Sequence, residues 1–162
     1  MTMPNGKRTH QYLTFQLDTE WYAIEVSRIE EVLEYQAITR VPKMPETMRG
    51  VINVRGNVVP VVDLRYKFGL TISEATVNTC IIVLEVVIES ETIRIGTIAD
   101  TVEEIVELGP DQIEPTPKIG TKLNNDSIEG IGKVEEQFVV ILNTDKIFTT
   151  EDIGQVAEPA AE

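Results

Sequence analysis

Two clusters of glutamate are the residues of this chain whose types and spacing could support catalysis. Carboxylates that lie close together, with one of them partly buried, can act as a general acid and a general base. The first glutamate of each cluster has a simpler role, because it closes a four-residue pattern typical of a helix capping box. The other glutamates would lie on solvated faces, so we expect no catalytic site here. The clusters are Glu30, Glu31 and Glu34, and Glu103, Glu104 and Glu107, and the capping boxes are Ser27–Glu30 and Asp100–Glu103.

The chain has one histidine, His10, and one cysteine, Cys80. His10 stands in a polar N-terminal stretch, so we expect it to take no part in Ser-His or Cys-His catalysis. Cys80 begins an apolar run and is predicted to be a small core residue. Neither a disulfide nor a zinc site of cysteines and histidines can be built from these residues. We therefore predict no enzyme activity, no metal and no cofactor.

Arg55 is the residue whose position most needs a functional explanation. Together with Gly56 and Asn57 it interrupts the apolar run GVINVRGNVVPVVDL, residues 50–64. A hairpin turn explains the last two, because Gly56 supplies a positive φ and Asn57 tolerates one. It does not explain an arginine. Glu31 lies in the same half of the chain, so we predict an Arg55–Glu31 ion pair beside a docking cleft.

The net charge of the chain is −13, from 27 acidic and 14 basic residues. A field of this sign repels phosphate backbones and anionic lipids, so we expect no nucleic-acid partner and no direct membrane insertion. The N-terminal stretch lacks the apolar segment of a signal peptide. No apolar run reaches the ~18 residues of a membrane span. The sequence therefore predicts a cytoplasmic protein.

Alternating apolar residues and turn residues predict four β-hairpins. Short helices are expected at the two capping boxes and within residues 63–70 and 143–153. The predicted fold class is therefore all-β with a few short helices. The expected pairs of strands are 11–17 and 21–26, 51–54 and 58–62, 80–88 and 92–99, and 129–134 and 138–143.

The order of these elements repeats along the chain. RIEEVLE, residues 28–34, is similar to TVEEIVE, residues 101–107. Residues 50–68 align without a gap with residues 130–148, at a constant offset of 80 (130 − 50 and 148 − 68). Two copies of about five short strands predict two small barrels that share a core.

The repeat also predicts the domain organisation. We expect a single domain over residues 11–153, made of subdomains at about 11–70 and 78–150, between which terminal elements can be exchanged. Residues 1–10 and 154–162 are predicted to be flexible tails.

Three stretches carry a resemblance to a known family: QYLTFQLDTEWYAIEVSRIEEVLEY, ITRVPKMPETMRGVINVRGNVVPVVDLRYKFG and RIGTIADTVEEIV. They resemble the CheW family of chemotaxis coupling proteins over about residues 11–150. The resemblance implies two SH3-like five-stranded β-barrels packed around a shared hydrophobic core. It also implies a non-catalytic adaptor that links the cytoplasmic tips of methyl-accepting chemotaxis receptors to the regulatory domain of the histidine kinase CheA. The adaptor would be recruited to membrane-associated receptor arrays. The alternative is a detached regulatory domain of a CheA-type kinase, which is itself a homologous double barrel.

The resemblance further implies which residues bind the receptor. They lie in a cleft between the barrels, and two of them, in the second copy of the repeat, match the family less closely. The contact with the kinase would use apolar strand edges. The receptor-binding residues implied in this way are Ile29, Glu31, Gly50, Arg55 and Gly56, with Gly96 and Val102 in the second copy.

Overall fold

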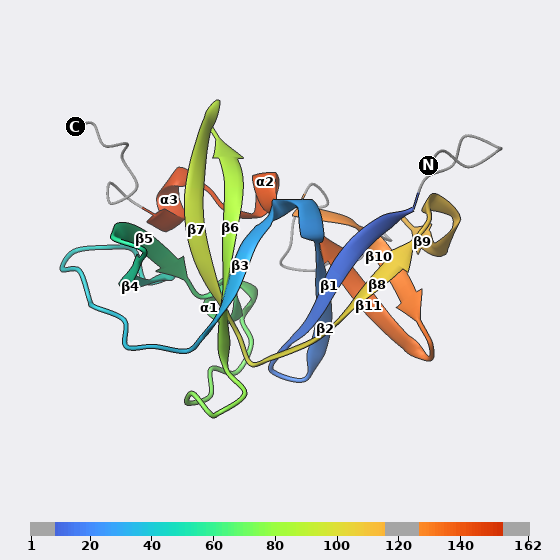
Figure 1. The fold of residues 1–162 in the computed structure, drawn as a ribbon, viewed down its shortest axis with the longest axis horizontal. Helices are drawn as coiled ribbons and strands as arrows, with labels where there is room; N and C mark the ends of the chain where they lie inside the picture. The colour runs from blue at the N-terminus through green and yellow to red at the C-terminus, as the bar shows by residue number, and fades with distance from the viewer. Residues whose placement is uncertain (1–8, 116–126, 154–162) are drawn as a thin grey trace.

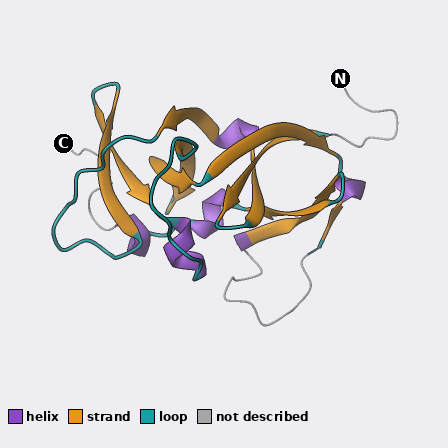
Figure 2. Cartoon of the chain, turned by 90° about the horizontal axis from the view of Figure 1, so that it is seen from below, coloured by secondary structure: helices purple, strands orange, loops and turns teal. Residues whose placement is uncertain are grey.

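Two curved β-sheets make up the protein in the computed structural model, which describes residues 9–115 and 127–153 (Figure 1). The five-stranded sheet forms the left-hand lobe of this view and the six-stranded sheet the right-hand lobe. Seen from below, the right-hand strands curl round toward one another (Figure 2). The predicted all-β class with a few short helices is confirmed. The predicted tails lie outside the described residues except for Thr9 and His10, and His10 already begins a strand.

The six-stranded sheet is antiparallel except at one contact in its middle, where β2 and β11 run parallel. Its strands, in spatial order, are β8 (Thr101–Leu108), β1 (His10–Leu17), β2 (Glu20–Glu25), β11 (Gln137–Leu142), β10 (Ile128–Val134) and β9 (Ile113–Glu114).

The five-stranded sheet repeats this plan, with its parallel contact between β5 and β7. Its strands, in spatial order, are β3 (Ile29–Glu34), β6 (Cys80–Ile88), β7 (Glu91–Ala99), β5 (Asn57–Val62) and β4 (Met48–Val54). Short helices connect or follow the strands: η1 (Val26–Arg28), α1 (Leu64–Phe68), η2 (Pro110–Gln112), α2 (Thr144–Ile147) and α3 (Thr150–Ile153).

Each sheet takes strands from both halves of the chain. The N-terminal hairpin β1–β2 lies in the sheet of β8 to β11, and the hairpin β6–β7 lies in the sheet of β3 to β5. The two parallel contacts are the places where the halves join. They pair Val140 and Ile141 with Tyr22 and Ala23, and Val61 and Val62 with Gly96 and Thr97. A cut between residues 70 and 78 would therefore divide the strands of both sheets.

The buried apolar side chains form three clusters, which fit two barrels on a shared core. One cluster fills the five-stranded barrel, with Ile52, Val54, Val59, Val61, Ile81, Val83 and Ile98. A smaller one fills the six-stranded barrel, with Tyr12, Ala23, Leu108, Val139 and Ile141. The largest draws on both sheets and on both α1 and α2, and includes Phe15, Ile24, Leu64, Leu84, Ile95, Ile147 and Phe148.

The helices predicted at the two capping boxes are wrong. Residues 29–34 form the edge strand β3, and residues 101–108 form the edge strand β8. Only the three residues of η1 are helical near the first box, and no side chain caps them. Each strand pairs with a central strand, β3 with β6 and β8 with β1, and these ladders outweigh a local capping pattern. The helices predicted within 63–70 and 143–153 are confirmed as α1, α2 and α3.

The two halves share local details at positions that the predicted repeat relates. Asp63 caps α1 by accepting from the Arg65 amide, and Asn143, at the offset of 80, caps α2 by accepting from the Asp145 amide. The register of each hairpin shifts just before the same glycine, Gly50 in β4 and Gly130 in β10.

Candidate docking surface

Arg55 and Glu31 form the predicted ion pair. Arg55 Nη2 donates to Glu31 Oε1 at 3.0 Å, and the Arg55 side chain is 78% exposed while that of Glu31 is 21% exposed. The hydrogen bond from Arg55 to Glu31 and the attraction of that carboxylate hold the pKa of Arg55 above its usual value. β3 and β4 stand at opposite edges of the strand order, so this pair bridges the two edges of the curled sheet. The pair presents a charged group that is oriented and open to solvent.

The turn that carries Arg55 differs by one residue from its prediction. The positive φ values belong to Arg55 (54°) and Gly56 (88°), whereas Asn57 already belongs to β5. Two successive left-handed residues make the turn that suits a two-residue hairpin loop. Asn53 Oδ1 accepts from the Gly56 amide at 2.7 Å and fixes the turn. A Cβ at Gly56 would meet no atom within 4 Å, so this glycine is needed for its backbone conformation and not for close packing.

Ile29 and Val102 occupy equivalent places in the two barrels. Both are partly buried and pack against the shared core, Ile29 opposite Leu84 and Val102 opposite Phe15. The structure therefore brings these two predicted residues to one apolar cluster, from edge strands of different sheets.

Gly50 lies in the edge strand β4 and Gly96 in the central strand β7 of the five-stranded sheet. They flank Val61, which pairs with Gly50 on one side and Gly96 on the other. A Cβ at Gly50 would lie 2.2 Å from the carbonyl oxygen of Thr39, and Gly50 has a φ of 147°. A Cβ at Gly96 would lie 3.0 Å from Ile81 Cγ2. Both are buried, so they shape the sheet beneath the surface and offer no side chain to a partner.

Sequence reasoning missed a buried ionic network at the start of α1. Arg65 donates from Nε and Nη2 to both oxygens of Asp63, each at 3.0 Å, and from Nη1 to Asp100 at 2.7 Å. Arg49 adds a hydrogen bond of 2.7 Å to Asp63. Burial alone would raise the pKa of Asp63, but the hydrogen bonds and charges of Arg65 and Arg49 outweigh it and lower the pKa. The segment VDLR holds Asp63 and Arg65, but nothing local reveals that Asp100 completes the network.

Four exposed apolar side chains are also arranged in equivalent pairs. Val58 and Phe138 follow the two hairpin turns, at the offset of 80, and are 67% and 63% exposed. Val32 and Ile105 lie on the edge strands β3 and β8, at the offset of 73 that relates Ile29 to Val102, and are 41% and 55% exposed. Each barrel thus offers apolar surface near its edge.

The residues with side chains suited to catalysis either form other contacts or lie in different sheets. His10 Nδ1 lies 3.1 Å from Glu25 Oε2 in the six-stranded sheet, whereas Cys80 belongs to the five-stranded sheet, where burial raises the pKa of its thiol. Glu30 accepts from Arg94 Nε at 2.7 Å and Nη2 at 3.0 Å. Glu103 accepts from Gln16 at 3.0 Å. Glu30, Glu31 and Glu103 are therefore engaged in surface ion pairs and hydrogen bonds.

Two further observations concern only residues 9–115 and 127–153. No group of three or more His, Cys, Asp or Glu side chains there is placed to hold a metal ion. None of the helices has the length and hydropathy of one that crosses a membrane.

Two interlocked barrels with an oriented, exposed ion pair and exposed apolar edges define a protein-interaction module. The comparisons with known proteins agree with this class. The family model described as "CheW-like domain" matches residues 11–152, so the chain belongs to the CheW family.

Individual relatives match over most of their length. The chemotaxis protein CheW of Bacillus subtilis is 32% identical over 94% of this chain and 95% of its own. The chemotaxis protein CheW of Klebsiella aerogenes is 30% identical over 90% of this chain and 86% of its own. The crystal structure of the scaffolding protein TtCheW from Thermoanaerobacter tengcongensis is 29% identical, with a TM-score of 0.75 over 88% of this chain and 90% of that one.

Proposed function

We propose that this chain is a non-catalytic adaptor of chemotaxis signalling, which couples the cytoplasmic tips of chemoreceptors to the histidine kinase CheA. It would act in the cytoplasm and be recruited to membrane-associated receptor arrays. The observation that carries the proposal is the CheW-like match over residues 11–152, together with the oriented Arg55–Glu31 pair at the surface. The relatives that match over most of their length are CheW proteins, which favours the adaptor over a detached regulatory domain of a kinase.

The seven predicted receptor-binding residues would contribute in three ways. Ile29 and Val102 would line an apolar groove into which a receptor helix lays its side chains. Arg55, oriented by Glu31, would supply a polar contact at the rim. The three glycines would act indirectly, through the turn at Gly56 and the close sheet packing at Gly50 and Gly96.

The kinase contact would use the exposed apolar residues at the barrel edges. Val58 and Val32 would make this contact on one barrel, and Phe138 and Ile105 would make it on the other. A homologous double barrel could pack against either edge, so one adaptor could join two kinase domains. Each contact would be modest in area and weak, and the assembly would gain strength from multivalency.

Co-purification and kinase assays test this proposal. The full chain is mixed with a receptor cytoplasmic fragment and CheA, and binding and autophosphorylation are measured with and without it. We expect both partners to co-purify and kinase output to depend on the chain. If neither partner binds and kinase output does not change, the adaptor function is wrong.

The Arg55→Glu variant tests the receptor surface. We expect it to lose receptor binding while keeping its fold, because an exposed side chain at a turn contributes little to the core. Adding Glu31→Arg should restore part of the binding if the two residues pair. Lys146→Glu, an equal change of charge at an exposed position of α2, is the matched control and should bind normally.

A further inference from the structure

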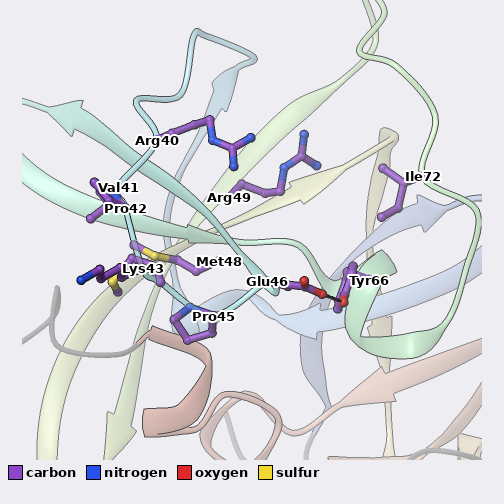
Figure 3. Close-up of a pocket in the computed structure, with 11 residues that line it drawn as sticks. Arg40, Val41, Pro42, Lys43, Pro45, Glu46, Met48, Arg49, Tyr66 and Ile72 are labelled. Atoms are coloured by element: carbon purple, nitrogen blue, oxygen red, sulfur yellow. Dashed lines mark hydrogen bonds between the residues drawn. The ribbon is translucent and has the colours of Figure 1, made fainter.

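A pocket of about 730 Å³ lies at the opposite end of β4 from Arg55. It is walled by residues 40–46 of the connection between β3 and β4, by the first residues of β4, by Tyr66 of α1 and by Ile72 (Figure 3). Arg49 in this wall is six residues from Arg55 along an extended strand, which separates their Cα atoms by roughly 20 Å. We call this the β3–β4 pocket, and it is distinct from the surface around Arg55.

Basic side chains outnumber acidic ones in the lining of the pocket, although the chain carries a net charge of −13. The lining includes Arg40, Lys43 and Arg49 but one carboxylate, Glu46, which accepts a hydrogen bond from the Tyr66 hydroxyl. Within the described part of the chain, neither Arg40 nor Lys43 has an ion-pair partner. The pocket is therefore a local region of positive potential on an acidic protein.

Arg49 keeps its capacity to bind an anion although it contacts Asp63. Its Nη1 donates to Asp63 Oδ2 at 2.7 Å, but the same carboxylate already receives two hydrogen bonds from the guanidinium of Arg65. A guanidinium has five N–H donors, so the contact with Asp63 orients Arg49 without exhausting it.

The two arginines of the pocket are turned the same way. In Figure 3 the guanidinium groups of Arg40 and Arg49 point toward the same side of the pocket, and the Lys43 ammonium points away from them. Like charges that converge favour an anion between or beside them. The planar fork of a guanidinium fits a carboxylate through two hydrogen bonds.

The rest of the lining is apolar and adaptable. Val41, Met44, Met48 and Ile72 contribute aliphatic or thioether surface. Methionine adjusts its shape to different partners. A small inorganic anion would leave this apolar surface in water. A peptide that carries a carboxylate beside an apolar side chain would use both parts of the pocket.

We propose that the β3–β4 pocket binds a short acidic peptide segment of a partner protein. A glutamate or aspartate of the segment contacts Arg40 and Arg49, and a neighbouring apolar side chain packs on Met44 and Met48. The site does not depend on the receptor surface around Arg55, and a partner bound here would leave that surface free.

Fluorescence anisotropy with a defined probe tests this site. The probe is a fluorescein-labelled peptide, Glu-Leu-Glu-Phe-Glu, and its counterpart carries glutamine in place of each glutamate. The full chain should bind the acidic probe with a Kd on the order of 100 μM at low ionic strength. Arg40→Glu should weaken binding about tenfold. Lys133→Glu, the same change of charge at an exposed position of β10 in the other sheet, should change it about twofold or less.

Each contrary result would rule out a specific part of the proposal. Absence of binding to the acidic probe, or equal binding of the glutamine probe, would overturn the proposal. An equal loss in Arg40→Glu and Lys133→Glu would show a general charge effect and not a site. Displacement of the probe by inorganic phosphate, beyond that by chloride at equal ionic strength, would indicate a simple anion site and overturn the peptide assignment. Arg55→Glu should bind the probe normally, which separates this result from the test of receptor coupling.

Discussion

The turn between β4 and β5 and the turn between β10 and β11 are both two residues long and begin with a left-handed residue, but these first residues carry opposite charges. Arg55 and Glu135, which are related by the offset of 80, have φ values of 54° and 57°. Arg55 meets Glu31 across the curled sheet, whereas Glu135 and Glu104, at the equivalent positions, are both acidic. The barrel architecture therefore accepts either charge at this turn. This difference between the turns agrees with the docking role proposed for Arg55.

The two helix caps show a different relation between the repeats. In the first copy Arg65 of α1 pairs with Asp100 at 2.7 Å, and in the second copy Asp145 of α2 pairs with Arg28 at 2.6 Å. The polarity of the ion pair is reversed. Arg65 is almost fully buried and also pairs with the buried Asp63, while Arg28 and Asp145 are both partly exposed. The first junction should therefore be much more sensitive to loss of a charge than the second.

Substitution of Asp63 should have the largest effect on stability. Asp63→Ala would leave the Arg65 guanidinium buried without its main partner, which costs about 3–5 kcal/mol. Asn143→Ala, at the equivalent cap, loses a helix cap and should cost about 1 kcal/mol. Free energies of unfolding in urea measure both. Equal losses in the two variants would contradict the contrast between the junctions.

The pH dependence of the free energy of unfolding gives a second measure of how much Asp63 contributes to stability. The pKa of Asp63 is lowered in the folded state, so its ionic stabilisation is complete above its unfolded pKa of about 3.9 and is lost as pH falls through the lower folded value. Asp63→Asn keeps a cap of the kind found at Asn143 but carries no charge. Its stability should fall less steeply in acid than that of the parent chain, and an equal slope would contradict the account.

Substitution of the glycines should have the next largest effect. Gly50→Ala places a Cβ against the carbonyl of Thr39 in a backbone conformation that disfavours alanine, and should cost roughly 2–4 kcal/mol. Gly130→Ala meets Ile113 Cγ2 at 2.5 Å and the carbonyl oxygen of Glu114 at 2.7 Å, without the positive φ, so it should cost less. Gly56→Ala has open space and should cost about 1 kcal/mol. Thermal unfolding gives the ranking, and a reversed order would be inconsistent with these roles.

Substitution of Glu129 should have the smallest effect, and with the opposite sign. Burial, reinforced by Glu25, raises the pKa of Glu129, so stability falls as pH rises through that raised value. Glu129→Gln should therefore stabilise the protein by about 0.5 kcal/mol at pH 7 and not at pH 3. Arg49, its equivalent in the first copy, bonds to Asp63, so Arg49→Gln should destabilise. Urea unfolding at both pH values checks the sign of the stability change. A loss of stability in Glu129→Gln at pH 7 would refute this prediction.

Much of the fold could be predicted because its signals are local. The four hairpins follow from alternation and turn residues, and every strand boundary lies within one residue of its expected position except the start of β4, which lies three residues earlier. The edge strands could not be predicted, because Ser27–Glu30 and Asp100–Glu103 have the local pattern of a capped helix. Their conformation is decided by pairing with β6 and β1, which are distant in sequence.

The candidate site was predictable only in part. The Arg55–Glu31 pair could be proposed from an unexplained arginine and a carboxylate in the same repeat, and the structure confirms the contact. The Asp63–Arg65–Asp100 network could not, because its members come from the start of α1 and from the end of β7, and only the exchanged hairpins bring them together. The sequence also could not predict Arg40 as a pocket residue, because a pocket depends on how a loop folds over its neighbours.

Moving the arginine from one turn to the other tests the central claim most directly. The double variant Arg55→Glu/Glu135→Arg keeps the net charge and gives each turn a residue that the other already tolerates. Receptor-coupled autophosphorylation of CheA should be lost, while the free energy of unfolding changes by about 0.5 kcal/mol or less. Unchanged coupling in this variant would contradict the assignment of Arg55 to docking, and so would loss of the folded state.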